Sequence, residues 1–355
     1  MPVIGSLRRI VFAIFAVALA GSSVSAQSPV DFFQGKTIRI VIATGAGASY
    51  DVFGRLVARH MSGFLPGKPN LIAENMPGAD GIKAANYLYS VAPKDGTVIA
   101  TFNSAIAFYE AQAQPGIQFR GVELSWIGSL PQDPAVVAIL DGPVHSLDEA
   151  RTVPVAIGAT GATGTMAGYP ALLNSLFGTK FRIITGYDGG NAVNLAMERG
   201  EVQGRGNSTW AAYKVARPDW VSGKRIIPLV QIGLHKDPDL PDTPLLIDLA
   251  RNPEERQMLD LVSSTVSLGQ PFAAPPGVPA ERIALLRTAF AQMVLSSPFY
   301  DDAVKMAAVQ RKIEPIPADE VERIVRDTVG TPKELVERLR IAMNPKDATK
   351  AGDGQ

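Results

Sequence analysis

An apolar, strand-like run that ends in a glycine-rich turn and opens a helix-like segment occurs three times in this chain. The three units lie at residues 38–51, 153–166 and 181–197. Glycine lets another group approach the backbone closely, and the first turn of a helix has unpaired N–H groups at its positive dipole end. Such turns at the carboxyl ends of neighbouring parallel strands form a cleft suited to a small anion. The pattern therefore predicts an α/β fold with an anion-binding cleft.

The order of strand-like and helix-like segments predicts largely parallel sheets and two lobes in the 355-residue chain. We expect one lobe to contain residues 27–130 and 268–343, and the other to contain residues 131–267. Two crossings between the lobes predict a hinge with a cleft. The polar tail, residues 344–355, is expected to be disordered.

The amino terminus has the pattern of a secretory signal, residues 1–26. Arg8 and Arg9 precede an apolar run at residues 10–20, which is too short to span a bilayer comfortably. Small residues at 24–26 predict cleavage before Gln27; an uncleaved membrane anchor is the alternative. The chain has no cysteine, which excludes a lipid-modified amino terminus and a thiolate metal site. A protein free in the periplasm fits these features.

The charge balance gives no reason to expect a nucleic-acid partner. The chain has 34 basic and 34 acidic residues and a formal net charge of zero. No cofactor or metal is indicated either, because the three histidines, His60, His145 and His235, have no metal-ligand spacing. Without a Gly-x-Ser-x-Gly elbow or an evident acid–base pair, the sequence gives little support to catalysis.

The first turn, residues 44–51, matches neither of the common phosphate-binding loops. It has no Gly-Lys-Ser/Thr ending, and Tyr50 stands where the dinucleotide fingerprint needs glycine. The remaining interpretations are an anion-binding turn capped by Ser49 or Asp51, and a tight structural connection. Tyr50 and Trp210 are candidates for stacking on a planar ligand, although a tryptophan near a cleft is more often a core residue.

The other two turns carry polar groups that suit a carboxylate. Thr160, Thr163 and Thr165 offer hydroxyl groups beside backbone N–H groups, but threonines also cap helices for structural reasons. Arg205, at the end of a later strand, is a candidate to bind a carboxylate through two hydrogen bonds; a surface ion pair is the alternative.

The chain resembles the solute-binding proteins of tripartite tricarboxylate transporters, the Bug family, from about Phe33 to Val329. Five segments carry the resemblance by their order and spacing: Lys36–Val41 with the turn and Asp51, Glu74–Gly81, Ala92–Thr97, Gly189–Asn191 with Met197–Val202, and Phe272–Pro279. The chain departs from the family pattern at Ala48-Ser49, where glycines are usual, and at Gln203, where an aspartate is usual.

The resemblance implies a two-lobe fold of the type II periplasmic-binding-protein kind, which closes on a small organic carboxylate and delivers it to a membrane permease. With the candidates above, the expected ligand-binding residues are Gly45, Ala46, Gly47, Ala48, Ser49, Tyr50, Asp51, Asn103, Ser104, Thr160, Gly161, Thr163, Gly164, Thr165, Asp188, Gly189, Gly190, Asn191, Arg205 and Trp210. We expect a monomer without catalytic activity. A ligand sensor with the same site and a secreted hydrolase are the alternatives, and the sequence does not name the carboxylate.

Overall fold

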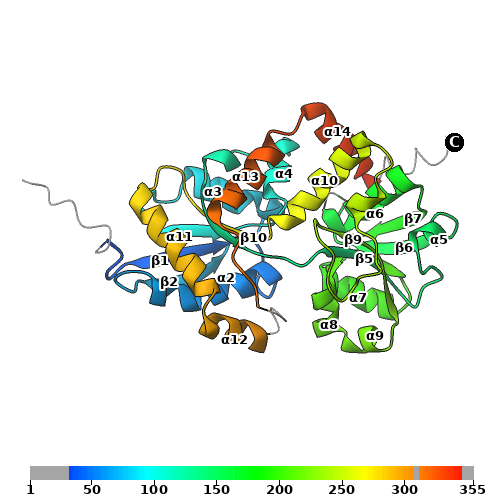
Figure 1. Cartoon of the computed structure of the whole chain (residues 1–355), viewed down its shortest axis with the longest axis horizontal. Coiled ribbons are helices and arrows are strands. Elements are labelled where there is room, and N and C mark those ends of the chain that lie inside the picture. The colour runs from blue at the N-terminus through cyan, green and yellow to red at the C-terminus, as the bar shows by residue number, and fades with distance from the viewer. Residues whose placement is uncertain (1–31, 163, 307–311, 346–355) are drawn as a thin grey trace, which may run out of the picture.

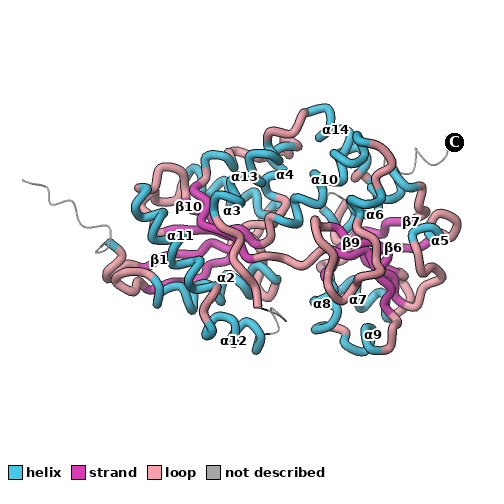
Figure 2. The backbone as a smooth tube through the Cα atoms, viewed as in Figure 1, coloured by secondary structure: helices cyan, strands magenta, loops and turns pink. Residues whose placement is uncertain are grey.

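The computed structural model describes residues 32–162, 164–306 and 312–345. The expected signal peptide, Thr163 and nearly all of the expected disordered tail lie outside these residues. The described residues form two α/β lobes joined side by side, each with a sheet covered by helices (Figures 1 and 2). No helix among the described residues has the length and apolar character needed to cross a bilayer.

The first lobe is built on a five-stranded sheet. Its strands are, in order, β2 (Asn70–Asn75), β1 (Thr37–Ile42), β3 (Val98–Thr101), β10 (Gln270–Ala274) and β4 (Ser125–Leu130). Its helices are α2 (Ser49–His60), α3 (Ile82–Ser90), α4 (Ile106–Ala111), α11 (Ala280–Val294), α12 (Ser297–Lys305) and α13 (Ala318–Val329), with short 3-10 turns at Met61–Phe64, Ala79–Gly81 and Gly121–Glu123. Alternate residues of β1 face opposite sides, so Ile40 packs with α2 and α11 while Val41 packs with α3 and α13.

The second lobe repeats this plan. Its strand order is β7 (Phe181–Thr185), β6 (Val155–Ala159), β8 (Gly204–Thr209), β5 (Ala135–Leu140) and β9 (Ile226–Ile232). Its helices are α5 (Leu147–Ala150), α6 (Thr165–Phe177), α7 (Gly190–Glu198), α8 (Trp210–Ala216) and α9 (Pro218–Ser222), and a 3-10 turn lies at Leu246–Leu249.

The α/β class is confirmed, but the sheets are mixed and not largely parallel. Strand β1 is parallel to β2 and β3, and β6 is parallel to β7 and β8. In contrast, β10 runs antiparallel to β3 and β4, and β5 runs antiparallel to β8 and β9. The reversed strands are those that the chain enters when it crosses between the lobes, at residues 131–134 and before Gln270. A crossing chain arrives at the edge where the parallel strands end, so its next strand runs the opposite way.

The carboxy-terminal part adds a further crossing that the sequence pattern does not reveal. Helix α14 (Lys333–Ala342) follows α13 of the first lobe but packs against α6 of the second lobe. Helix α10 (Pro253–Ser267) contacts both α13 and α14. The expected division into residues 27–130 plus 268–343 and residues 131–267 stays a prediction, but α14 lies with the second lobe in the structure (Figure 1).

One apolar cluster joins the two lobes along the side that carries α10, α13 and α14. It contains Trp126 of the first lobe and Leu172 of the second. Tyr109 on α4 and Tyr169 on α6 belong to it, and burial raises the pKa of both phenols. This packing holds the lobes together on one side of the crossings and leaves the other side for a cleft.

Candidate functional site

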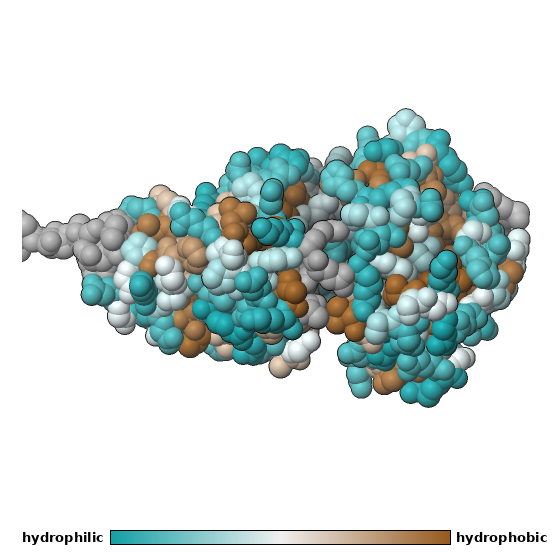
Figure 3. Space-filling view, turned by 60° about the horizontal axis from the view of Figure 1, so that its bottom comes forward, coloured by the Kyte–Doolittle hydropathy of each residue, from teal (hydrophilic) through white to brown (hydrophobic). Residues whose placement is uncertain are grey.

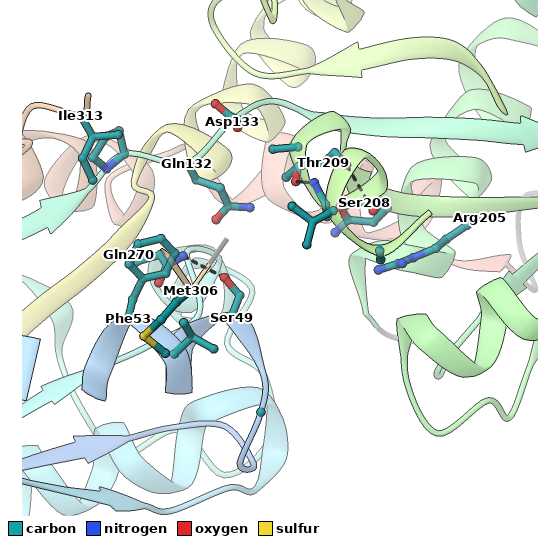
Figure 4. Close-up of a pocket in the computed structure, with 18 of the residues that line it drawn as sticks. Ser49, Phe53, Gln132, Asp133, Arg205, Ser208, Thr209, Gln270, Met306 and Ile313 are labelled. Atoms are coloured by element: carbon teal, nitrogen blue, oxygen red, sulfur yellow. Dashed lines mark hydrogen bonds between the residues drawn. The ribbon is translucent and has the colours of Figure 1, made fainter. Parts of the chain in front are cut away.

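A cleft of about 490 Å³ lies between the two lobes, beside the crossing at residues 131–133. The first lobe presents the turn after β1, the start of α2 and the first residue of β10, while the second lobe presents β8 and α8 (Figure 4). The two sheets therefore point the ends of their parallel strands at a common space, which is the usual place for a ligand in such folds.

Neutral polar groups line the first-lobe side of the cleft. The buried Gln270 donates through Nε2 to Ser49 Oγ at 3.1 Å, and its Oε1 is buried without a partner among the described residues. Gln132, on the crossing, projects into the space between these residues and the second lobe (Figure 4). Gly47 lies at the rim of the same wall. In the part of the chain that the structure describes, this wall offers hydroxyl and amide groups and no positive side chain.

Asp51 is a structural residue of the first turn. Its carboxylate accepts hydrogen bonds from the backbone N–H of Gly47 at 2.9 Å, from Arg55 Nε at 2.9 Å and from Asn75 Nδ2 at 2.7 Å. Burial alone would raise the pKa of Asp51, but these donors outweigh burial and lower it. Asp51 therefore stabilises the turn by accepting the hydrogen bond of the Gly47 N–H. The N-cap residue of α2 is Ala48, which forms no side-chain cap hydrogen bond, so neither Ser49 nor Asp51 is the N-cap.

Strand β8 supplies the polar residues of the second-lobe side. Arg205, Asn207 and Thr209 alternate along the strand and so share one face. Asn207 donates through Nδ2 to Thr165 Oγ1 at 2.7 Å, which ties β8 to the first turn of α6. Thr209 accepts a hydrogen bond from the N–H of Ala212 at 3.1 Å and caps α8. The strand end is thus fixed by both helices that flank it.

Arg205 is a positive charge without a carboxylate partner among the described residues. Its Nη1 donates to Asn194 Oδ1 at 3.3 Å, and its Nε is buried with no hydrogen-bond partner. Burial lowers the pKa of the guanidinium, because removing the charge from water costs free energy that no acid here offsets. A buried cation that lines a cleft and lacks a counter-ion is suited to bind an anion.

The third glycine turn creates the space that Arg205 occupies. A Cβ atom on Gly190 would lie 2.2 Å from Arg205 Nη2 and 2.4 Å from Cζ. The start of α7 therefore lies directly against the guanidinium, and only a residue without a side chain fits there. Helix α7 has no side-chain cap, so its first N–H groups and Arg205 place positive charge together.

Apolar side chains complete the wall on both lobes. On the first lobe these are Val52, Phe53, Met306 and Ile313; on the second lobe they are Met166, Ala211, Ala212, Val215 and Ala216. The four residues on α8 are spaced at i, i+1, i+4 and i+5, so they form one helical face. The described residues of the cleft wall therefore combine the positive charge of Arg205 with a largely apolar surface.

The structure places three of the sequence-predicted residues in the cleft wall: Gly47, Ser49 and Arg205. Three others touch it through these or neighbouring residues: Asp51 bonds to Gly47, Thr165 bonds to Asn207, and Gly190 lies against Arg205. The described candidates that do not line this cleft are Gly45, Ala46, Ala48, Tyr50, Asn103, Ser104, Thr160, Gly161, Gly164, Asp188, Gly189, Asn191 and Trp210.

Both aromatic candidates have structural partners. Tyr50 accepts a hydrogen bond at its hydroxyl from the N–H of Ser104 at 2.9 Å, which joins the turns after β1 and β3. Trp210 is 8% exposed and packs edge-on against Tyr213, with 6.3 Å between the ring centroids. Their rings are used in packing, as the core interpretation of Trp210 predicts.

Sequence reasoning missed the polar residues Gln132, Asp133, Asn207, Ser208, Thr209 and Gln270. Two signals pointed to some of them. Gln132 and Asp133 lie on the expected lobe crossing, which has to pass the cleft, and Asn207 and Thr209 continue the alternation that begins at Arg205. Gln270 is the first residue of an otherwise apolar strand, and only its position between the lobes makes it a site residue.

Metal and catalytic constellations are not found among the described residues. No group of three or more histidine or acidic side chains there could hold a metal ion. The cleft wall contains no histidine within the described ranges. His60 instead bonds to Asp302 through Nε2 at 2.9 Å, at the contact between α2 and α12.

Two curated proteins are similar to the chain in sequence, and no family model matches it. A UPF0065 protein of Cupriavidus necator, named for the gbd 5′ region, is 26% identical over 337 residues, which is 92% of this chain and 94% of that protein. A UPF0065 protein of Bordetella bronchiseptica is 36% identical over 102 residues, 29% of each chain. The second match is therefore local, and the first extends over nearly the whole chain.

Solved structures of solute-binding proteins match over the whole described fold. A TctC solute-binding protein from Polaromonas has a TM-score of 0.64 at 20% identity and covers 85% of this chain and 98% of that one. Rpa4515 of R. palustris, solved with adipate, has a TM-score of 0.64 at 17% identity over 86% and 97% of the two chains. MatC of Rhodopseudomonas palustris, with bound malate, has a TM-score of 0.61 at 16% identity over 85% and 99%. The resemblance to the Bug and TctC solute-binding proteins is thus confirmed, and the chain has their two-lobe α/β fold.

Proposed function

We propose that this chain is a solute-binding protein that holds a small organic carboxylate between its lobes. The buried guanidinium of Arg205 in the wall of the cleft, which has no carboxylate partner among the described residues, is the observation that carries the proposal. The carboxylate would accept charge-assisted hydrogen bonds from Arg205, while Ser49, Gln132 and Gln270 contact the ligand from the other side. Because only a closed form makes both sets of contacts, the ligand favours closure about the crossings.

The proposal extends to location and partner. The amino-terminal sequence pattern supports export to the periplasm with cleavage before Gln27. The fold shared with TctC and Bug proteins supports delivery of the ligand to the permease of a tripartite tricarboxylate-type transporter. The adipate and malate in two neighbours of this fold support a carboxylate ligand and a role without catalysis.

The binding proposal is tested on purified protein that starts at Gln27. A thermal-shift screen of small mono- and dicarboxylates identifies ligands, and calorimetry gives their Kd. Each hydrogen bond to a charged group contributes about 1.5–3 kcal/mol, so Arg205→Gln should weaken binding by about tenfold to a hundredfold or more, with Arg205→Lys in between. Arg182→Gln removes an exposed arginine of the same sheet and serves as the control. Equal affinity of the wild type and Arg205→Gln would contradict the proposal, as would a screen in which no carboxylate raises Tm.

The transport proposal is tested in cells. Mass spectrometry of the periplasmic fraction should find Gln27 as the first residue. Uptake of the labelled ligand should depend on both this protein and a tripartite permease. Uptake that persists when either is deleted would contradict the transport proposal.

A further inference from the structure

We propose that Gln270 is a positioning residue that fixes the Ser49 hydroxyl as a hydrogen-bond donor to the carboxylate of the ligand. The inference rests on the proposed function and names a residue that determines how the first lobe recognises an acid. It follows from the direction of one hydrogen bond and from the depth at which its two partners lie.

Strand β10 places Gln270 behind Ser49 as seen from the cleft. Phe272 of this strand packs in an apolar cluster with Leu56 of α2, and Gln270 lies two residues earlier, so its side chain is on the same face of the sheet. Gln270 is 4% exposed, whereas Ser49, the first residue of α2, is exposed. The amide is therefore buried, and the hydroxyl lies at the surface of the cleft (Figure 4).

The hydrogen bond between these two side chains runs from the amide to the hydroxyl. Gln270 Nε2 donates to Ser49 Oγ at 3.1 Å. A hydroxyl group has one hydrogen to donate, and an amide nitrogen cannot accept it. Ser49 can therefore donate its hydrogen toward the cleft, and a carboxylate is a strong acceptor for it. An amide oxygen facing Ser49 would instead take up this hydrogen and leave a hydroxyl lone pair toward the cleft, which repels an anion.

The second lobe contains the same kind of hydrogen bond. Asn207 Nδ2 donates to Thr165 Oγ1 at 2.7 Å, and Thr165 is the first residue of α6, as Ser49 is of α2. In both lobes a side-chain amide on a strand thus donates to the hydroxyl at the first position of a helix. Each of these hydroxyl groups has its own hydrogen left over from the bond with the amide.

Apolar surroundings strengthen a donor of this kind. Val52 and Phe53 follow Ser49 on α2 and line the same cleft. The space-filling view shows hydrophobic surface on both sides of the gap between the lobes (Figure 3). When a ligand fills the cleft, less water competes for the hydroxyl. A hydrogen bond that is polarised by a second donor behind it then becomes stronger.

A double-mutant cycle tests whether Gln270 acts through Ser49. The probe is the acid of lowest Kd in a series of mono- and dicarboxylates from acetate to adipate, measured by calorimetry at pH 7.5. Gln270→Met removes the donor and keeps a side chain of similar length. It should raise Kd by about threefold to tenfold when Ser49 is present, and by less than about twofold in Ser49→Ala. Equal effects in the two backgrounds would overturn the inference.

The variant Gln270→Glu gives a readout that a purely structural role would not change. An ionised carboxylate can only accept, so it takes up the Ser49 hydrogen, and Kd should rise by at least about tenfold at pH 8. Burial raises the pKa of a carboxyl group, and its protonated form can donate to Ser49 again. Affinity should therefore recover several-fold between pH 8 and pH 6.

Two proteins control for the other titratable groups and for net charge. The wild type shares every other titratable group with Gln270→Glu. Gln118→Glu adds the same charge at an exposed position outside the cleft wall. The affinity of both should change little over this pH range. A Gln270→Glu profile parallel to theirs would contradict the inference.

The two proposals fail in different ways. If an acid binds in an Arg205-dependent way but the Gln270 variants lack the coupling to Ser49 or the pH profile, the role of Gln270 is wrong and the proposed function stands. If no carboxylate binds in an Arg205-dependent way, the proposed function itself fails, and this inference fails with it.

Discussion

The guanidinium of Arg205 occupies the space that a side chain on Gly190 would need. A Cβ atom at Gly190 would lie 2.2 Å from Nη2 and 2.7 Å from Nη1. The turn before α7 and the strand β8 therefore form one unit, in which the glycine positions the arginine. The lack of a carboxylate beside Arg205 among the described residues leaves this unit ready to bind an anion.

Gly190→Ala should weaken carboxylate binding without unfolding the protein. The new methyl group displaces the guanidinium by roughly 1 Å or more, and the flexible arginine can move at little cost. Because the hydrogen bonds to the ligand are disturbed, Kd should rise by about tenfold. Calorimetry measures the affinity, and thermal unfolding checks that Tm stays near the wild-type value.

Gly189→Ala is the control for this substitution. Nothing lies within 4 Å of a Cβ at Gly189, and its φ of 168° is extended backbone that any residue adopts. It should bind as the wild type does. If both variants lose affinity equally, the effect belongs to the turn as a whole and not to the position of Arg205.

Gly47→Ala should weaken binding more than Gly45→Ala. Gly47 has a φ of 80°, a conformation that costs a residue with a side chain about 1–2 kcal/mol. The substitution strains the turn that presents Gly47 and Ser49 to the cleft, so Kd should rise by about fivefold or more. Gly45 lies in open space and has no positive φ, so it provides the matched control. Wild-type affinity in Gly47→Ala would remove the first turn from the site.

The sequence is sufficient to predict the framework of the site. The three glycine turns lie between strand and helix as expected, because local rules set them: an apolar run, a flexible turn and a helix with apolar spacing. The same local rules correctly predict that the turns before α2 and α7 follow parallel strands, which are β1 and β7. The sequence singles out Arg205 by residue type, but the expected position at the end of a strand is wrong, because Arg205 is the second residue of β8 (Gly204–Thr209).

The wall of the cleft depends on contacts between distant parts of the chain, which local patterns do not encode. Gln270 bonds to Ser49 across 221 residues of sequence. Tyr50 matched a stacking role by residue type, yet its hydroxyl bonds to Ser104, 54 residues away. Whether an aromatic ring faces a ligand or the core depends on tertiary packing, and the crossing of α14 to the second lobe also depends on tertiary packing.

The stability of the protein should depend on Asp51 in acid. A lowered pKa in the folded state means that the Asp51 carboxylate stabilises the fold above its unfolded pKa of about 4 and loses this contribution as pH falls through the lower folded value. Between pH 6 and pH 3, Tm of the wild type should fall more than Tm of Asp51→Asn. Thermal unfolding across this range measures the difference, with the exposed Asp242→Asn as a control. Parallel curves for all three proteins would show that Asp51 does not anchor the turn.

Close packing of α6 on β8 predicts that Gly206→Ala destabilises the second lobe. A Cβ at Gly206 would lie 2.0 Å from the carbonyl oxygen of Met166 and 2.5 Å from the ring of Pro170, so the helix has to shift. Overpacking of this kind costs about 1–3 kcal/mol in the free energy of unfolding, which urea titration measures. Gly161→Ala is the control because a Cβ there meets no atom within 4 Å. Because Thr165 of α6 is also hydrogen-bonded to Asn207 of β8, the variant should lose ligand affinity as well. An unchanged free energy of unfolding would mean that the helix and strand can move apart without cost.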